Sequence, residues 1–253
     1  MFEISTHLAL ILVCAAFLAG FVDAIAGGGG LITVPVLLLC GLTPAQALAT
    51  NKLQGCFGSG TAAVTYARAG HVRPLGQWKM AVVAIIASAA GAVLALALPT
   101  DLLRGVMPFI LIAVALYFGL KPGLSEGAGA ARMGPLVFGA TVVPVVALYD
   151  GFFGPGAGSF YMLGFVLLAG QGMLQATAHT KFLNFSSNLG SLIVFAFGGH
   201  ILWALGLSMA AAQVGGASLG ARLAMRVGSG LIRPLLVVVC LALAVRLLWQ
   251  TYG

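Results

Sequence analysis

Long apolar runs separated by short polar stretches make up most of this chain. The runs lie near residues 6–26, 45–67, 75–98, 104–120, 132–149, 173–198, 203–225 and 231–250. A helix needs about 20 mostly apolar residues to cross the hydrocarbon core of a bilayer, and each run approaches that length. The pattern therefore predicts an all-α integral membrane protein with at least eight transmembrane segments.

Two further apolar runs, Leu31–Leu42 and Gly158–Ala169, each follow a glycine-rich stretch. Both are too short for an ordinary span of about 20 residues. We expect half-helices, re-entrant segments or thin spans at these places, and the sequence leaves the choice open. Counting them raises the number of membrane segments from eight to ten.

The second half of the chain repeats the first. Asp23, Gly27 and Gly29 match Asp150, Gly154 and Gly156 at an offset of 127 residues. An offset of 129 residues relates Ala47, Ala49, Lys52, Gly70, His71, Gly91 and Arg104 to Ala176, Ala178, Lys181, Gly199, His200, Gly220 and Arg233. A two-residue insertion between Gly29 and Ala47 reconciles the offsets. We therefore predict two homologous halves, 1–122 and 134–253, joined by a linker loop at 123–133.

Loop charge predicts how the two halves are oriented. The loop at 68–79 holds three basic residues, whereas its mate at 199–203 holds only His200. The loop at 222–233 is basic, whereas its mate at 99–104 pairs Asp101 with Arg104. Because basic loops favour the cytoplasm, the alternation predicts inverted repeats of five segments each, with both termini outside.

Composition narrows the class of protein further. Apolar residues make up 61% of the chain and charged residues only 7%, with twelve basic against five acidic side chains. A soluble domain usually has about a quarter charged residues. The bilayer is therefore the expected partner, and the scattered basic residues predict no nucleic-acid partner. We interpret the first run as a span and not a removed signal peptide, because no basic residue precedes it.

No metal site or cofactor is predicted. The four cysteines stand singly in apolar runs, with no C-x-x-C pair. His71 and His200 fall at equivalent loop positions, where an interfacial place is more typical than a metal ligand.

Four charged residues stand out inside or directly beside the predicted membrane segments. They are Asp23, Lys52, Asp150 and Lys181. A charge at the centre of a membrane helix costs about 2.5 to 3.5 kcal/mol on insertion scales, so such residues are usually paired or functional. We predict that Lys52 and Lys181 bind substrate, and that Asp23 and Asp150 carry coupled protons or pair with the lysines. The alternative is that each lysine only neutralises an aspartate or extends to the interface.

The glycine-rich stretches after Asp23 and Asp150 predict broken helices. A break exposes amide N–H groups at the start of the next half-helix, and such N-termini attract anions. Discontinuous helices of this kind form substrate sites near the midplane of many secondary transporters. We therefore predict substrate binding at Gly28, Gly29, Gly156 and Gly158. Close helix packing is the alternative role of these glycines.

Hydrogen-bonding side chains accompany both lysines. Asn184 and Asn188 follow Lys181 at i+3 and i+7 on one helix face, and Asn51 and Thr180 directly precede the two lysines. Lysine supplies charge and three donors, whereas amides and hydroxyls orient a ligand. These four residues complete the predicted substrate site for a small anion.

Two signatures in this sequence resemble the TauE/SafE family of sulfite exporters. They are D-A-I-A-G-G-G-G-L-I-T-V-P with A-T-N-K, and D-G-F-F-G-P-G-A-G with H-T-K-F-L-N-F-S-S-N. The resemblance covers about residues 8 to 250, although the G-G-G-G run lacks the proline of the second break. It implies a multi-pass carrier of the bacterial inner membrane that exports sulfite, sulfonates or related organosulfur anions.

These observations predict a secondary transporter for a small sulfur-containing oxyanion and not an enzyme. The chain shows no H-E-x-x-H or G-x-S-x-G pattern that would support an intramembrane hydrolase. An anion channel and an assembly factor for other membrane proteins are the alternatives. The sequence leaves open which anion moves, in which direction, with which coupling ion, and whether the chain forms a homo-oligomer.

Overall fold

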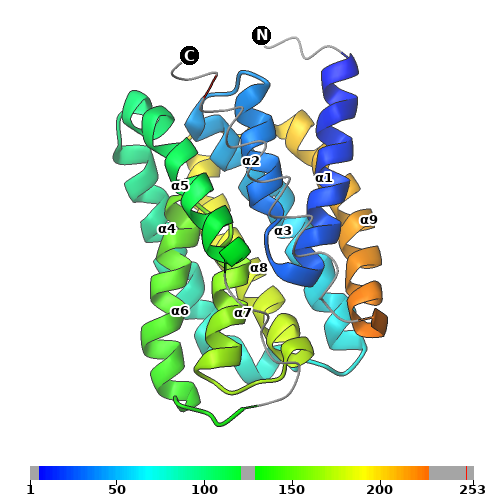
Figure 1. Cartoon of the computed structure of the whole chain (residues 1–253). Coiled ribbons are helices and arrows are strands. Elements are labelled where there is room, and N and C mark those ends of the chain that lie inside the picture. Colours follow the sequence, from blue (N-terminus) through cyan, green and yellow to red (C-terminus); the bar gives the residue numbers. More distant parts are fainter. Residues whose placement is uncertain (1–5, 121–128, 228–248, 250–253) are drawn as a thin grey trace.

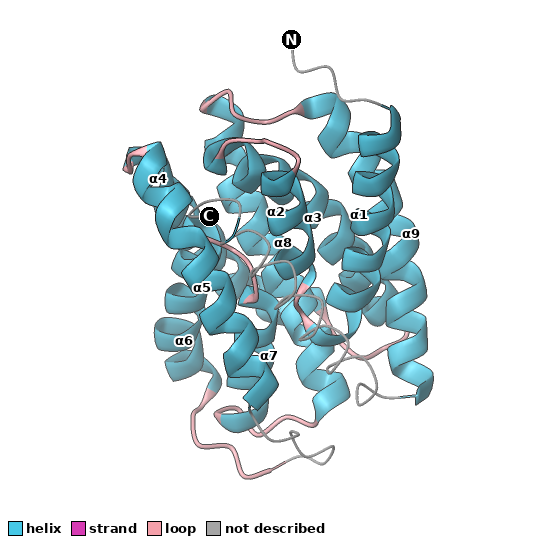
Figure 2. Cartoon of the chain, turned by 45° about the horizontal axis from the view of Figure 1, so that its top comes forward, coloured by secondary structure: helices cyan, strands magenta, loops and turns pink. Residues whose placement is uncertain are grey.

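A computed structural model describes residues 6–120, 129–227 and 249, and the described secondary structure is helical throughout (Figure 2). The first half contains α1 (Thr6–Ala26), α2 (Gly29–Leu39), α3 (Pro44–Arg68), the short 3₁₀ helix η1 (Pro74–Gln77), α4 (Trp78–Ala97) and α5 (Thr100–Leu120). The second half contains α6 (Pro135–Phe152), α7 (Ala157–Leu167), α8 (Met173–Phe197) and α9 (Trp203–Val227). The all-α membrane fold is thereby confirmed.

Seven of the eight predicted long runs are helices in the described part of the chain. The eighth, at 231–250, lies outside the described residues except for Trp249, as does the 123–128 part of the predicted linker. Four helices are long and apolar enough to cross a bilayer by composition alone: α1, α4, α6 and α9. Helices α3 and α8 have 25 residues each, but their buried polar residues lower their mean hydropathy.

The two short helices each run back beside the helix that precedes them. In Figure 1, α1 descends from the top and α2 rises again, whereas α6 rises from the bottom and α7 descends. Each short helix has 11 residues, so it spans about 16 Å at 1.5 Å per residue. Because the hydrocarbon core is about 30 Å thick, each helix is about half as long as an ordinary span.

The described helices pack into two groups that do not coincide with the halves of the sequence. Helix α9 packs along α1 and α3, and α4 packs along α6 and α8. We call α1, α2, α3 and α9 the first unit, and α4, α6, α7 and α8 the second unit. The units join where α3 packs against α8. Each unit thus contains three helices from one half of the sequence and one helix from the other.

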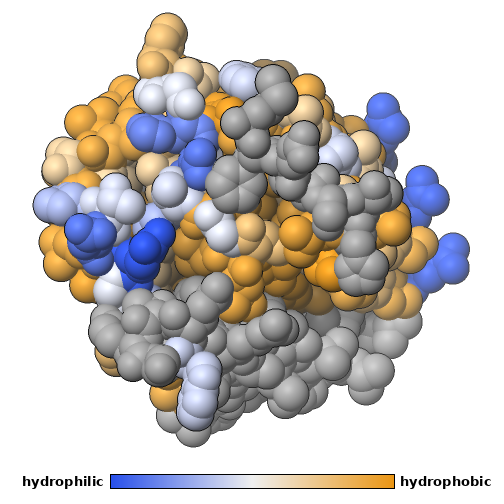
Figure 3. Space-filling model, turned by 90° about the horizontal axis from the view of Figure 1, so that it is seen from above, coloured by the Kyte–Doolittle hydropathy of each residue, from blue (hydrophilic) through white to orange (hydrophobic). Residues whose placement is uncertain are grey.

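The outer surface is apolar, as contact with lipid requires. Large hydrophobic side chains are exposed on many helices, including Ile86 and Val145, which are 65% and 68% exposed. Hydrophobic side chains also dominate the coloured surface when the molecule is seen from above, and hydrophilic ones form only a few clusters (Figure 3). The polar groups that matter for function therefore lie inside the bundle.

Candidate functional site

The two helix breaks contact each other directly. The backbone amide of Ser159, in the first turn of α7, donates to the Gly27 carbonyl at 2.9 Å. The Ser159 hydroxyl donates to the Ala26 carbonyl at 2.7 Å. The tip of the second break therefore caps the carbonyl end of α1 and holds the two breaks together.

Only glycine fits at the first break. Gly27 has a φ of +80°, a left-handed conformation that other residues adopt with strain. A Cβ atom at this position would also lie 2.5 Å from the carbonyl carbon of Gly158. The G-G-G-G run therefore allows a sharp turn and a close approach of two backbones at the same place.

Each intramembrane lysine pairs with the aspartate of the other half. Lys52 on α3 lies 2.5 Å from an Asp150 carboxylate oxygen on α6, and Lys181 on α8 lies 3.2 Å from one of Asp23 on α1. Each ammonium also donates to the backbone carbonyl of the same aspartate. Both lysines are fully buried. Burial of a charge is tolerated when a partner and hydrogen bonds satisfy it, so the two pairs account for these charges.

The two lysines lie at the same distance from the start of their helices. Both follow the first residue of their helices by eight positions (52 − 44 and 181 − 173). At 1.5 Å per residue this places each lysine about 12 Å along its helix. Because each ion pair joins the first unit to the second, the charges sit at the contact between the units.

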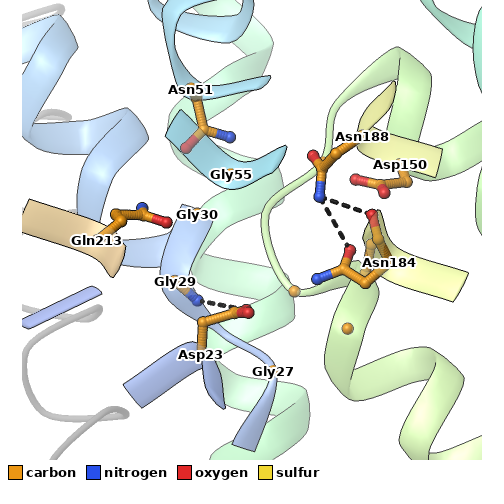
Figure 4. A pocket seen from close by; sticks show the side chains of 14 residues that line it. Asp23, Gly27, Gly29, Gly30, Asn51, Gly55, Asp150, Asn184, Asn188 and Gln213 are labelled. Carbon is orange, nitrogen blue, oxygen red and sulfur yellow. Dashed lines mark hydrogen bonds between the residues drawn. The ribbon is translucent and has the colours of Figure 1, made fainter. Parts of the chain in front are cut away.

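A polar pocket of about 30 Å³ lies between the two units. Its lining comprises Asp23, Gly27, Gly29, Gly30, Asn51, Gly55 and Gln213 from the first unit and Asp150, Gly154, Gly156, Ala157, Gly158, Asn184 and Asn188 from the second or from the break before α7. Figure 4 shows the labelled side chains of the two groups facing each other across the pocket. A volume of this size accommodates water, so the pocket is nearly closed around its centre.

Amide donors point into the pocket. The Asn51 Oδ1 atom accepts from the Thr33 hydroxyl at 2.6 Å, which turns Asn51 Nδ2 toward Gly30. Asn184 Oδ1 accepts from Asn188 Nδ2 at 3.3 Å, which turns Asn184 Nδ2 toward Gly158 (Figure 4). Within the described residues, neither Nδ2 atom has a hydrogen-bond acceptor. The pocket therefore presents unused donors, as a site for an anion requires.

Backbone amides add to these donors. Gly30 and Gly158 lie in the first turns of α2 and α7, where no preceding helical turn supplies an acceptor. No described group accepts a hydrogen bond from either amide. Two helix N-termini, each with a partial positive charge, thus meet at the pocket.

Most of the predicted site residues gather at this pocket. Its lining includes Gly29, Asn51, Gly156, Gly158, Asn184, Asn188, Asp23 and Asp150. Gly28 is the N-cap of α2. Lys52 and Lys181 are not in the lining and reach it through their aspartates. The Thr180 hydroxyl is buried without a hydrogen-bond partner. The roles predicted for these residues remain predictions.

The sequence analysis missed several contributing residues, among them Gly30, Thr33 and three polar side chains on other helices. Gln213 on α9 lines the pocket and is 3% exposed. Ser187 donates to Asp150, and Ser159 bonds the first break. Gln213 could have been found as an isolated polar residue in an apolar run. The serines carry no comparable signal, since their partners lie far away in the sequence.

The described residues contain no cluster of three His, Cys, Asp or Glu side chains suited to a metal ion. A second cavity, of about 790 Å³, lies between α3, α8 and α9. Phe182, Phe185, Arg68 and Arg222 contribute to its largely apolar wall, but no predicted site residue does. The polar pocket between the breaks is therefore the candidate site.

Comparison with known proteins shows the family of the chain. Residues 12–247 match the family described as "Sulfite exporter TauE/SafE". The chain belongs to this family. The matched range contains both helix breaks and both lysines.

Similar curated proteins carry transporter names. "Probable membrane transporter protein ORF9" from Sinorhizobium sp is 54% identical, over 98% of this chain and 95% of that protein. "Probable membrane transporter protein YfcA" from Escherichia coli strain K12 is 44% identical, over the whole chain and 94% of that protein. A protein of Haemophilus influenzae named "Probable membrane transporter protein" is 40% identical over 98% of this chain and 97% of its own length. No solved structure matches the chain significantly. This TauE/SafE protein is therefore a multi-pass membrane transporter.

Proposed function

We propose that this protein is a secondary transporter that exports a small sulfur-containing oxyanion, such as sulfite or a sulfonate, across the bacterial inner membrane. The observation that carries the proposal is the set of unused donors in the central pocket. Asn51, Asn184 and the amides of Gly30 and Gly158 converge where two half-helices meet. Oxyanions accept several hydrogen bonds at once, and half-helix N-termini are common anion sites in transporters.

Charge balance also favours an anion. The two aspartates at the pocket are each neutralised by a lysine, so the carboxylates do not leave the site with a net negative charge. The ammonium groups lie directly behind the carboxylates and can attract an oxyanion that approaches them. We further propose that Asp23 and Asp150 carry the coupled protons, because intramembrane carboxylates serve this role in many transporters.

The directions of the helices support inverted repeats. In Figure 1, α1 descends and its counterpart α6 rises, and α3 and α8 likewise run in opposite directions. Helices α3 and α9 end at the bottom, where they carry Arg68, Arg222 and Arg226, and α4 begins there after Arg73. Because basic residues favour the cytoplasm, we assign the bottom to the cytoplasm and the start of α1 to the outside.

A carrier fits the small pocket better than a channel. The pocket holds about 30 Å³, so a substrate can enter only after the surrounding helices move apart. A carrier undergoes such a movement in each cycle, whereas a channel needs a continuous path. The family name, together with a pocket closed between two units, favours transport over the alternative role in membrane-protein assembly.

Flux measurements test the proposal. Purified protein in liposomes should move sulfite or a sulfonate such as taurine down its gradient, whereas protein-free liposomes should not. Asn184→Asp replaces a pocket donor with a negative acceptor of nearly the same shape, so flux should fall by about tenfold or more.

The matched control makes the same amide-to-carboxylate change on the same helix. Gln175 on α8 is exposed and lies outside the pocket, so Gln175→Glu should keep flux within about twofold of the wild type. Absence of flux for every anion tested would contradict the proposed function. Equal flux in the wild type and the Asn184→Asp variant would show that the anion does not use this pocket.

A further inference from the structure

The two lysine–aspartate pairs are not equivalent, although the halves that contain them are homologous. The Asp150 side chain is 3% exposed, and both of its carboxylate oxygens are occupied, one by Lys52 and the other by the Ser187 hydroxyl. The Asp23 side chain is 14% exposed and lies 3.2 Å from Lys181. Among the described residues, its other oxygen accepts only from the Gly29 amide, also at 3.2 Å.

The sequence explains why side chains bind both carboxylate oxygens in only one of the two pairs. At the offset of 129 residues, the counterpart of Ser187 is Gly58, which has no hydroxyl (187 − 129 = 58). The Ser88 hydroxyl donates to the Ser187 backbone carbonyl and so fixes the position of Ser187. The counterpart of Ser88 is Ala217 (88 + 129 = 217), which cannot make this bond. Two serines thus hold Asp150 in place, and neither has an equivalent beside Asp23.

Both aspartates line the pocket, but the surroundings of Asp23 are less polar than those of Asp150. Gly58 occupies the position in the first half that Ser187 occupies in the second. The Gln213 side chain of α9 packs against Gly58. Gln213 also lines the pocket and has no hydrogen-bond partner recorded among the described residues. The greater exposure and longer contacts of Asp23 therefore leave its carboxylate freer to move than that of Asp150.

From these differences we infer that Lys181 and Asp23 form an exchangeable pair, whereas Lys52 and Asp150 form a fixed pair. An entering oxyanion displaces the Asp23 carboxylate from the Lys181 ammonium and takes its place. The fixed pair stays closed during this exchange and keeps α3 and α6 together while the anion enters. The inference rests on the proposed function and deepens it, because it assigns one of the two lysines as the direct cationic ligand of the substrate.

The exchange needs no change in covalent bonding. A carboxylate and an oxyanion such as sulfite present similar oxygen acceptors, so one can replace the other at the same ammonium. The displaced carboxylate keeps the Gly29 amide as a partner, since that bond uses its other oxygen. Asn184, on the same helix as Lys181, can donate to the anion in its new position.

Charge-neutral double variants test the inference in the purified full-length protein. Asp23→Asn with Lys181→Met removes the exchangeable pair, and Asp150→Asn with Lys52→Met removes the fixed pair at the equivalent place. Both leave the net charge unchanged and avoid an unpaired buried charge. The readout is the Tm in detergent with sodium sulfite, compared with sodium chloride at equal ionic strength.

Sulfite should raise the Tm of the wild type. The variant without the exchangeable pair should lose less Tm in chloride than the variant without the fixed pair, but it should lose the rise caused by sulfite. The variant without the fixed pair should have a clearly lower Tm in chloride and keep part of that rise. Loss of the rise only in the fixed-pair variant, or an equal loss in both, would overturn the inference.

The single variants Asp23→Asn and Asp150→Asn provide an independent readout. With Asp23 neutral, the Lys181 ammonium has no competing carboxylate, so sulfite should bind about tenfold more tightly and should rescue a lowered Tm. Asp150→Asn should show no such rescue. Sulfite flux in wild-type liposomes together with identical rescue of both variants would overturn this inference alone. A wild type that neither transports sulfite nor is stabilised by it would overturn the proposed function as well.

Discussion

Gly27 is the residue at which backbone conformation and packing act together. Its φ of +80° and its contact with the backbone of Gly158 both exclude a side chain. Gly70 has nearly the same φ, +83°, but no atom lies within 4 Å of the place where its Cβ would be. A substitution at Gly70 therefore tests backbone strain alone, whereas one at Gly27 tests strain together with steric overlap.

We predict that Gly27→Ala destabilises the protein by about 3 kcal/mol or more, because strain and overlap combine. Gly70→Ala should lower the free energy of unfolding by only about 1 to 2 kcal/mol, from strain alone. Thermal unfolding in detergent measures the difference, and flux in liposomes should fall with Gly27→Ala. Equal Tm values for the two variants would contradict the contact between the breaks.

The residues that carry charge could be predicted from the sequence, but their partners could not. Asp23, Lys52, Asp150 and Lys181 stand out because charges are rare in apolar helices. The repeat suggested that each half has one aspartate and one lysine, which is compatible with pairing inside a half or between halves. The observed pairs join residues 98 and 158 positions apart in the sequence, and no local pattern encodes such a contact.

At the scale of helices, the ends inside the membrane pose the main physical problem. The last carbonyl groups of α1 have no partner within the helix, and lipid offers none. Side chains from other helices supply the donors. Lys181 donates to Asp23, the Tyr66 hydroxyl to Ala24 at 2.9 Å, and the Ser159 hydroxyl to Ala26. The break in α1 is thus stabilised by residues from α3, α7 and α8.

This capping predicts that Ser159→Ala destabilises the protein by about 1 to 3 kcal/mol, because the part-buried Ala26 carbonyl at the end of α1 loses its donor. Ser186→Ala is the control, since the Ser186 hydroxyl only bonds back to the Phe182 carbonyl of its own helix. That change should be nearly neutral in thermal unfolding. A larger loss of Tm for Ser186→Ala than for Ser159→Ala would contradict the capping role.

Helix bounds were largely predictable, because span length and glycine breaks leave clear signals. The predicted run at Leu31–Leu42 becomes α2 at Gly29–Leu39. It begins earlier because glycines of the break form its first turn, and it ends before Gly41, whose φ is +90°. Apolar character alone could not locate either boundary. Nor could it show that each short helix runs back beside the helix before it.

At the scale of the whole molecule, the repeat in the sequence does not define the packed units. Matching positions at a constant offset shows which residues correspond, but not which helices touch. Helix α4 belongs to the first half and packs on α6 and α8 of the second, whereas α9 packs on α1 and α3 of the first. A movement of one sequence half against the other would have to break both of these interfaces. A movement of the two units would mainly alter the contact between α3 and α8.

Crosslinking can tell these two movements apart, because two close pairs both join the halves of the sequence. A Cβ at Gly139 on α6 would lie 3.2 Å from the Met80 side chain on α4, within the second unit. A Cβ at Gly60 on α3 would lie 3.0 Å from the Phe185 ring on α8, between the units. Paired cysteines at each place, in a background without the four native cysteines, can be joined by a short thiol reagent.

If the units move as bodies, a link between positions 80 and 139 should leave flux near that of the unlinked variant, since it joins helices that stay together. A link between positions 60 and 185 should abolish flux, because α3 and α8 must shift to open the pocket to one side. Movement of the sequence halves predicts that both links abolish flux. Unlinked samples of each variant establish the basal rate, so the loss can be assigned to the constraint and not to the substitutions.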